Sequence, residues 1–164
     1  MKLHHIGIAV TDMQDGHDFW NEIMGLPEGK AYRENDQGVD VAFFPTGDAN
    51  IELIYPYDKE NGVSKFINKR GPGMHHICFQ VSDLEAKLAE LKAKGIQLID
   101  EVPRINGKGV KVAFIHPKST GGVLVEFYEM DEEQSRTWME WLRSIPGSIN
   151  SLTGSLTDYV TGGR

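Results

Sequence analysis

Apolar residues alternate with small or polar residues near the start of the chain, and this period of two predicts a strand over residues 3–10. One face of that strand would carry His4, Ile6, Ile8 and Val10, and the other face His5, Gly7 and Ala9. We expect the first face to pack against a helix. Because its neighbours on the second face are small, His5 is expected to have open space around it.

The same pattern returns 71 positions later, so the chain contains an internal repeat. The segment His4-His5-Ile6-Gly7-Ile8-Ala9-Val10 matches His75-His76-Ile77-Cys78-Phe79-Gln80-Val81, and residues 39–44 match residues 110–115. After three extra residues, Ile51-Glu52-Leu53 matches Val125-Glu126-Phe127. A long repeat that keeps His and Glu at matching places predicts one module used twice, with the copies facing each other across one site.

Each copy is predicted to have the order βαβββ, with the helices beginning at Asp12 and Ser82 and ending at Gly25 and Gly95. The expected strands are 3–10, 31–34, 39–44 and 51–55 in the first copy, and 74–81, 96–99, 110–116 and 123–129 in the second. Residues 105–109 are expected to form a Gly-rich turn. We therefore expect an α+β domain over residues 1–130, made of module one (3–57), a linker (58–73) and module two (74–130).

Residues 131–164 have no counterpart in the repeat. Acidic residues at their start, followed by apolar residues at helical spacing, predict a C-terminal helical extension over residues 131–164, whose first helix ends at Pro146-Gly147. The pattern leaves open whether this extension packs on the body, covers the cleft or contacts a partner.

Composition narrows the classes of function. The chain has 164 residues and a formal net charge of −7, which argues against a general nucleic-acid-binding protein. Cys78 is the only cysteine, so no intrachain disulfide can form. We find no signal-peptide pattern and no apolar run long enough to cross a membrane, and we expect a cytoplasmic protein.

The candidate chemistry lies at four positions that the repeat relates in pairs, His5 with His76 and Glu52 with Glu126. A carboxylate inside so apolar a strand needs a partner if it points inward, because burying an isolated charge is very costly. Two imidazoles and two carboxylates suit a divalent ion such as Zn, Co, Ni, Mn or Fe. The simpler alternative is that these are ordinary polar residues on exposed strand faces, but the repeat relation favours a shared metal site.

The other members of the two His-His pairs, His4 and His75, fall on the opposite strand face. We expect them to be buried, hydrogen-bonded residues that pack toward the helices rather than toward the metal.

Several segments together resemble one family. They are His4-His5-Ile6-Gly7-Ile8-Ala9-Val10, Gln37-Gly38-Val39, Ile51-Glu52-Leu53 with Pro56, Lys65-Phe66, Gly73-Met74-His75-His76-Ile77, and His116-Pro117-Lys118-Ser119 followed by Gly122-Val123-Leu124-Val125-Glu126. Over residues 3–130 the chain resembles the vicinal oxygen chelate superfamily, which includes glyoxalase I and extradiol dioxygenases. Within it, the resemblance is closest to the methylmalonyl-CoA epimerases.

The resemblance implies a curled, mixed eight-stranded sheet that is open on one side, with helices outside and a divalent metal ion (Co, Zn, Ni or Mn) in the cleft. It also implies a homodimer that acts on a small acyl-CoA substrate. The reaction would be the interconversion of (R)- and (S)-methylmalonyl-CoA by removal of the α-proton through a metal-stabilised enolate. Glu126 and Glu52 would be the catalytic carboxylates on the two faces of the substrate.

Other substrate contacts are less specific. Lys118 and Ser119 are candidates for binding the thioester or carboxylate, although Pro-Lys-Ser also suits an ordinary turn. Asp40 is a further candidate base only if it faces the cleft. The basic residues Lys65, Lys69 and Arg70 suit either CoA phosphates or a solvated helix face.

Two other functions fit the same scaffold. One is a glyoxalase I-like lyase acting on a glutathione hemithioacetal. The other is a non-catalytic ligand-binding or resistance protein, which would have no need to keep all four His and Glu residues.

Overall fold

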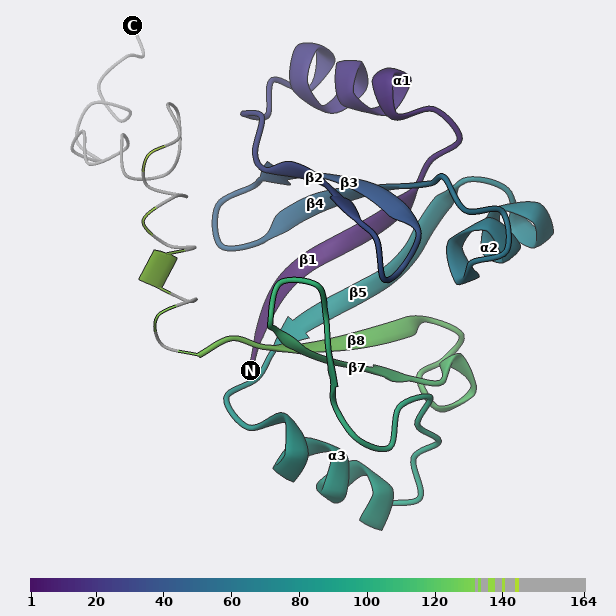
Figure 1. Cartoon of the computed structure of the whole chain (residues 1–164), viewed down its shortest axis with the longest axis vertical. Coiled ribbons are helices and arrows are strands. Elements are labelled where there is room, and N and C mark those ends of the chain that lie inside the picture. Colours follow the sequence, from purple (N-terminus) through teal and green to yellow (C-terminus); the bar gives the residue numbers. More distant parts are fainter. Residues whose placement is uncertain (132, 134–135, 138–139, 141–143, 145–164) are drawn as a thin grey trace, which may run out of the picture.

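The computed structural model describes residues 1–131, 133, 136–137, 140 and 144. In this part of the chain, eight strands form a mixed sheet in the order β2-β3-β4-β1-β5-β8-β7-β6 (Figure 1). The strands are β1 (Lys2–Ala9), β2 (Ala31–Glu34), β3 (Val39–Pro45), β4 (Asn50–Pro56), β5 (Gly73–Gln80), β6 (Arg104–Ile105), β7 (Lys111–Ile115) and β8 (Leu124–Glu129). The helical segments are α1 (Met13–Asp18), the π-helical turn η1 (Phe19–Ile23), α2 (Gly62–Arg70), α3 (Leu84–Ala93) and the short 3₁₀ turn η2 (Pro117–Ser119).

The two modules meet edge to edge at the centre of the sheet. Strands β1 and β5 pair antiparallel there, with Ile6 opposite Ile77. On either side, β4 runs parallel to β1 and β8 runs parallel to β5, so each half repeats the other about a local twofold axis. The sheet curls into a half-barrel, which confirms the predicted α+β fold.

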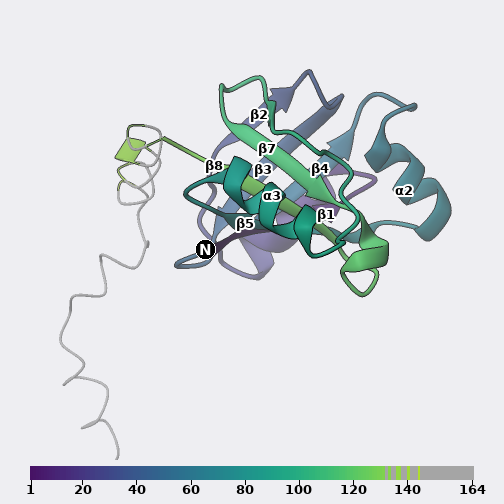
Figure 2. The same ribbon diagram turned by 90° about the horizontal axis from the view of Figure 1, so that it is seen from below.

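Helices α1 and α3 lie outside the curled sheet and each covers its own core, whereas Val63 of α2 packs with Val41 and Phe43 on the cleft side of β3. Figures 1 and 2 show α1 and α3 on opposite outer sides, with α3 lying over β7 and β8. In module two, Leu84 and Leu88 of α3 are buried against Phe127. In module one, α1 covers a smaller cluster that contains Phe44 and Leu53.

Helix α1 begins where the sequence predicts, since the Asp12 side chain accepts hydrogen bonds from the backbone N–H groups of Gln14 and Asp15. Helix α3 is capped by Asp83, whose carboxylate accepts from the Ala86 N–H, and not by Ser82. Both residues are good N-caps, so the sequence alone could not separate them.

Residues 96–99 do not form the predicted strand, and only Leu98 makes a bridge, to Ile115. The chain follows the β7 edge irregularly as far as Asp100: the N–H groups of Ile99 and Asp100 both donate to the Phe114 carbonyl, and the Asp100 carboxylate accepts a hydrogen bond from the Phe114 N–H at 2.9 Å. It then makes a detour before β6. Pro103 has no N–H to donate to a ladder, which favours this detour. The chain returns as the two-residue strand β6, part of which occupies the expected Gly-rich turn.

Most of the predicted C-terminal extension lies outside the described residues. Within 131–164, helical backbone is described at Glu133, Arg136, Thr137, Glu140 and Ser144. Among the described residues, no helix is long and apolar enough to cross a membrane.

Candidate metal centre

The four predicted residues lie on the four central strands of the sheet, at symmetry-related positions: His5 on β1, Glu52 on β4, His76 on β5 and Glu126 on β8. Glu52 on β4 lies beside Gly7 of β1 and Phe43 of β3. Glu126 on β8 lies beside Cys78 of β5 and Phe114 of β7, which are the repeat partners of Gly7 and Phe43. The repeat seen in the sequence is therefore a repeat of strand register, and it brings both carboxylates to the concave side of the sheet.

The side chains of these residues converge on one point. The Nε2 atoms of His5 and His76 lie 2.8 Å apart. Glu52 Oε2 lies 3.4 Å from the Nε2 of His5 and 3.5 Å from that of His76. Glu126 Oε2 lies 3.3 Å and 3.2 Å from the same two nitrogens. Two imidazole nitrogens and two carboxylate oxygens thus face a common centre.

All four residues are buried, with exposed fractions of 3% for His5, 8% for Glu52, 4% for His76 and 5% for Glu126. Burial raises the pKa of Glu52. Burial also acts to raise the pKa of Glu126, but hydrogen bonds with His5 and His76 outweigh it and hold that pKa below its ordinary value. Burial acts to lower the pKa of His76, and the contact with Glu126 reverses the shift. The two carboxylates therefore differ in their affinity for a proton although the repeat relates them.

The second histidine of each pair is hydrogen-bonded, as predicted, and its partner is the first histidine, but the predicted strand face was wrong. His4 Nδ1 lies 2.7 Å from His5 Nδ1, and His75 Nδ1 lies 3.1 Å from His76 Nδ1. Both residues line the cleft, and the His75 ring also packs edge-on against Phe66 of α2, with 4.9 Å between ring centroids.

The cause is an irregularity in each central strand. The pairing of β1 with β5 shifts between Leu3 and His5, and again opposite the step from Met74 to His76. His4 and His75 are the extra residues at these two shifts, and an extra residue breaks the alternation of strand faces. Consecutive histidines can therefore lie on the same side of the sheet.

This arrangement fits a divalent metal ion. A ligating His usually donates its second ring N–H to a neighbouring acceptor, which leaves the other nitrogen free for the metal. His4 and His75 can each accept such a hydrogen bond because burial, with the neighbouring His, lowers their pKa values to about 3 and about 4 and keeps their rings neutral. Two buried carboxylates also require nearby positive charge. His5, Glu52, His76 and Glu126 are the residues that would hold the ion.

The cleft around this centre is built mainly by module one. Val39, Val41 and Phe43 of β3 line it, together with Tyr32 and Glu34 of β2. The loop after β6 reaches across from module two, and the Lys108 ammonium lies over the Tyr32 ring. Burial lowers the pKa of Lys108 to about 8.

Comparison with known proteins identifies the family. Residues 4–114 match the model of the Glyoxalase/Bleomycin resistance protein/Dioxygenase superfamily. The chain belongs to this superfamily. It is 41% identical over 133 residues to the uncharacterized protein YqjC of Bacillus subtilis, covering 81% of this chain and 95% of that protein. It is 36% identical over 126 residues to the mitochondrial methylmalonyl-CoA epimerase of Homo sapiens, covering 76% of this chain and 72% of that protein.

Solved structures in the superfamily agree with the fold. A variant of the Streptomyces coelicolor methylmalonyl-CoA epimerase, in complex with 2-nitronate-propionyl-CoA, superposes with a TM-score of 0.75. It is 29% identical to this chain, and the match covers 80% of this chain and 96% of that one. The sequence-based assignment to the superfamily is thus confirmed.

Three residues that the sequence suggested for the site, Asp40, Lys118 and Ser119, do not line the cleft. Asp40 is held in a two-pronged ion pair by Arg33, with contacts of 2.7 and 3.0 Å. Lys118 is exposed in η2, and the Ser119 hydroxyl accepts a hydrogen bond from the Gln97 N–H at 2.9 Å. A substrate contact for Lys118 and Ser119 stays a prediction.

Sequence reasoning missed Glu34, which is buried and lines the cleft. A signal was available, because the alternation Ala31-Tyr32-Arg33-Glu34 puts Tyr32 and Glu34 on one face of a strand. The loop residue Asn106, which also lines the cleft, had no such signal because loop direction depends on tertiary packing.

Proposed function

We propose that the protein is a metal-dependent epimerase that interconverts (R)- and (S)-methylmalonyl-CoA. The observation that carries this proposal is the pair of symmetry-related carboxylates, Glu52 and Glu126, facing one buried centre from opposite halves of the sheet. Inversion at a carbon requires a proton to leave one face and return to the other, so two groups on opposite sides suit it. The epimerases among the relatives support the same reaction.

His5, Glu52, His76 and Glu126 would hold a divalent ion such as Co, Zn, Ni or Mn. When bound, the ion supplies positive charge next to the substrate oxygens on which negative charge develops during proton removal. Our hypothesis is that Glu126 exchanges between binding the metal and acting as base.

In the proposed reaction, the Glu126 carboxylate takes the α-proton, and the electron pair of the broken C–H bond moves into the thioester to form an enolate. Glu52, which like Glu126 would have to leave the ion to act and would then be a carboxylic acid, returns a proton to the opposite face. One turnover leaves Glu126 protonated and Glu52 ionised, and proton exchange with water resets the pair. Glu34, the other buried carboxylate of the cleft, is the alternative proton donor.

We also propose that the protein is a cytoplasmic homodimer, in line with the family resemblance. Light scattering coupled to size-exclusion chromatography measures the mass directly. An 18.4 kDa species at micromolar concentration would contradict the dimer.

The reaction is tested by incubating metal-loaded protein with methylmalonyl-CoA in heavy water and following loss of the α-proton by NMR. We expect rapid, metal-dependent exchange in the wild type and background exchange in His76→Ala. The matched control is His116→Ala, which removes an imidazole that caps η2 and does not line the cleft.

Exchange at the background rate, with a verified bound metal, would overturn the epimerase proposal. The hemithioacetal of methylglyoxal and glutathione would then be tested as substrate, because the same centre suits proton removal from it.

A further inference from the structure

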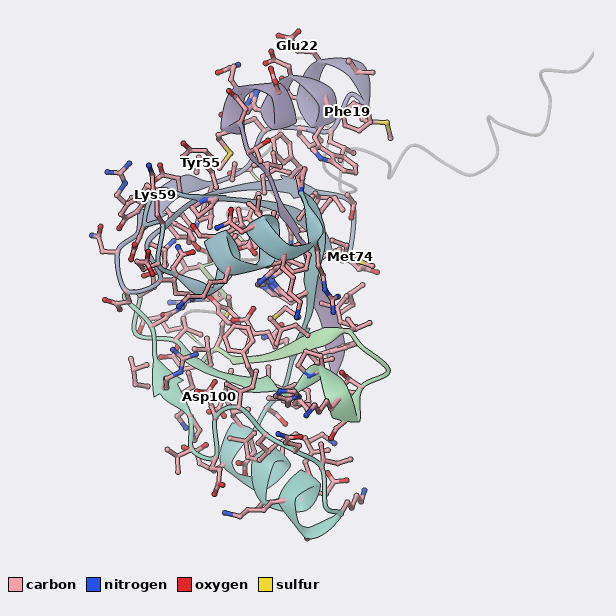
Figure 3. All side chains as sticks on the ribbon, turned by 90° about the vertical axis from the view of Figure 1, so that its right-hand side faces the viewer. Phe19, Glu22, Tyr55, Lys59, Met74 and Asp100 are labelled. Carbon is pink, nitrogen blue, oxygen red and sulfur yellow. The ribbon has the colours of Figure 1, made fainter. Side chains whose placement is uncertain are left out.

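A second hollow, which we call the basic groove, lies between α2 and the segment that joins β7 to β8. Its volume is about 290 Å³. Figures 1 and 3 show α2 and the segment around η2 projecting on the same side of the molecule. The lining residues are Gly62, Lys65, Phe66, Lys69, Arg70, His75, Pro117, Gly122 and Leu124.

The charge of the basic groove is unusual for this chain. Three cationic side chains from α2 line it, and none of the described lining residues carries a carboxylate, although the net charge of the protein is −7. Within the described part of the chain, Lys65, Lys69 and Arg70 form no ion pair. By contrast, Lys87, Lys92 and Lys94 in and after α3 are all paired with glutamates.

Helix stability does not account for this arrangement. Lys69 and Arg70 lie in the last turn of α2, where a cation is favourable next to the helix dipole. Lys65 lies one turn earlier and does not share that benefit. Lys65 and Lys69 are four residues apart, a spacing at which like charges on a helix repel each other. A bound anion would offset this repulsion.

The basic groove adjoins the metal centre, because His75 lines both hollows. The lining also includes the apolar side chains Phe66 and Leu124, and the Phe66 ring lies near both the Arg70 guanidinium, at 6.0 Å, and the His75 ring, at 4.9 Å between centroids. A ligand with a reactive end in the cleft, a flexible middle part and an anionic far end would match this order of surfaces.

We infer that the basic groove binds the coenzyme A part of an acyl-CoA substrate, with the pantetheine arm against Phe66 and Leu124 and the phosphates at Lys65, Lys69 and Arg70. This inference rests on the proposed function, since it names the part of the substrate that this surface recognises. Helix α2 would therefore determine the affinity for CoA, and the residues of the metal centre would carry out the proton transfer.

The test uses the triple variant Lys65→Gln/Lys69→Gln/Arg70→Gln in the full-length, metal-loaded protein. The matched control is Lys87→Gln/Lys92→Gln/Lys94→Gln, which removes the same charge from the region of α3. Calorimetry measures binding of free CoA and of adenosine 3′,5′-bisphosphate, neither of which reacts. We expect the α2 variant to bind both about 10- to 100-fold more weakly, because it loses three exposed charge pairs with the phosphates, and the α3 control to bind as the wild type does.

A kinetic measurement separates this inference from the proposed reaction. The KM for methylmalonyl-CoA should rise in the α2 variant while kcat is retained, and turnover of methylmalonyl-pantetheine, which lacks the phosphates, should not change. Equal CoA affinity in the wild type and the α2 variant would overturn the basic groove as the CoA site, even if proton exchange proceeds. Loss of CoA affinity in a protein that fails to exchange the α-proton would support the basic groove and overturn only the reaction.

Discussion

Gly7 is the position at which a single methyl group should do the most damage to the metal centre. A Cβ at this position would lie 2.2 Å from His76 Cε1, 2.5 Å from Nδ1 and 2.8 Å from Nε2. Ordinary contacts of a Cβ begin at 3.4 Å, so the nearest ring atom would have to retreat by about 1.2 Å, the difference between 3.4 and 2.2 Å. Gly7→Ala therefore displaces His76 from its place beside Glu52 and Glu126.

The size of the effect follows from that displacement. A misplacement of about 1 Å in a reacting group costs about 100-fold in rate, and overpacking a buried site costs about 1–3 kcal/mol of unfolding free energy. We expect Gly7→Ala to fold, to bind a divalent ion at least tenfold more weakly, and to exchange the α-proton about 100-fold more slowly. Competition with a coloured chelator measures the metal affinity, and circular dichroism checks the fold.

The repeat provides the matched control. Cys78 is the repeat partner of Gly7 and already places a buried side chain beside His5. Cys78→Ser therefore adds no bulk to the centre, keeps a group that can hydrogen-bond to Glu126, and should keep both metal affinity and exchange rate close to those of the wild type. Full metal occupancy and normal exchange in Gly7→Ala would refute the argument that this glycine makes room for His76.

Four further measurements test the site and the fold. Glu126→Gln should lower the exchange rate by about 100- to 10,000-fold, because an amide cannot act as base; normal turnover would remove Glu126 from the mechanism. Chelation should abolish exchange and lower the unfolding free energy by about 2.7 kcal/mol relative to protein at about 100 times the metal Kd, and an unchanged melting temperature would contradict a bound ion. His4→Ala should weaken metal binding about 10- to 100-fold, with partial rescue by His4→Asn, whose carbonyl oxygen can accept the same hydrogen bond. Leu84→Ala, at a fully buried position of α3, should lower the unfolding free energy by about 3 kcal/mol in urea titrations without changing metal affinity.

Much of the fold could be predicted from the sequence, because an internal repeat indicates that the two halves share one order of strands. A βαβββ unit written twice, with matching residues in its first and last strands, predicts matching strand order in both halves. It also explains why His5, His76, Glu52 and Glu126 meet, since residues at equal places in two symmetry-related strands come to the axis together. The missed elements lie where the copies differ, as at residues 96–105, where Asp100 stands in the place of Gly29 and the first copy has no proline corresponding to Pro103.

The orientation of His4 and His75 shows why a local pattern was not sufficient. Strict alternation puts neighbouring residues on opposite faces, and it therefore sends His4 away from His5. A one-residue shift in pairing removes that rule, and such a shift depends on the partner strand, which lies about 70 residues away. The repeat nevertheless contained an indirect signal: His-His occurs at both copies of the shift. A polar pair retained at both symmetry-related positions is better explained by two residues acting on one centre than by one ligand and one buried bystander.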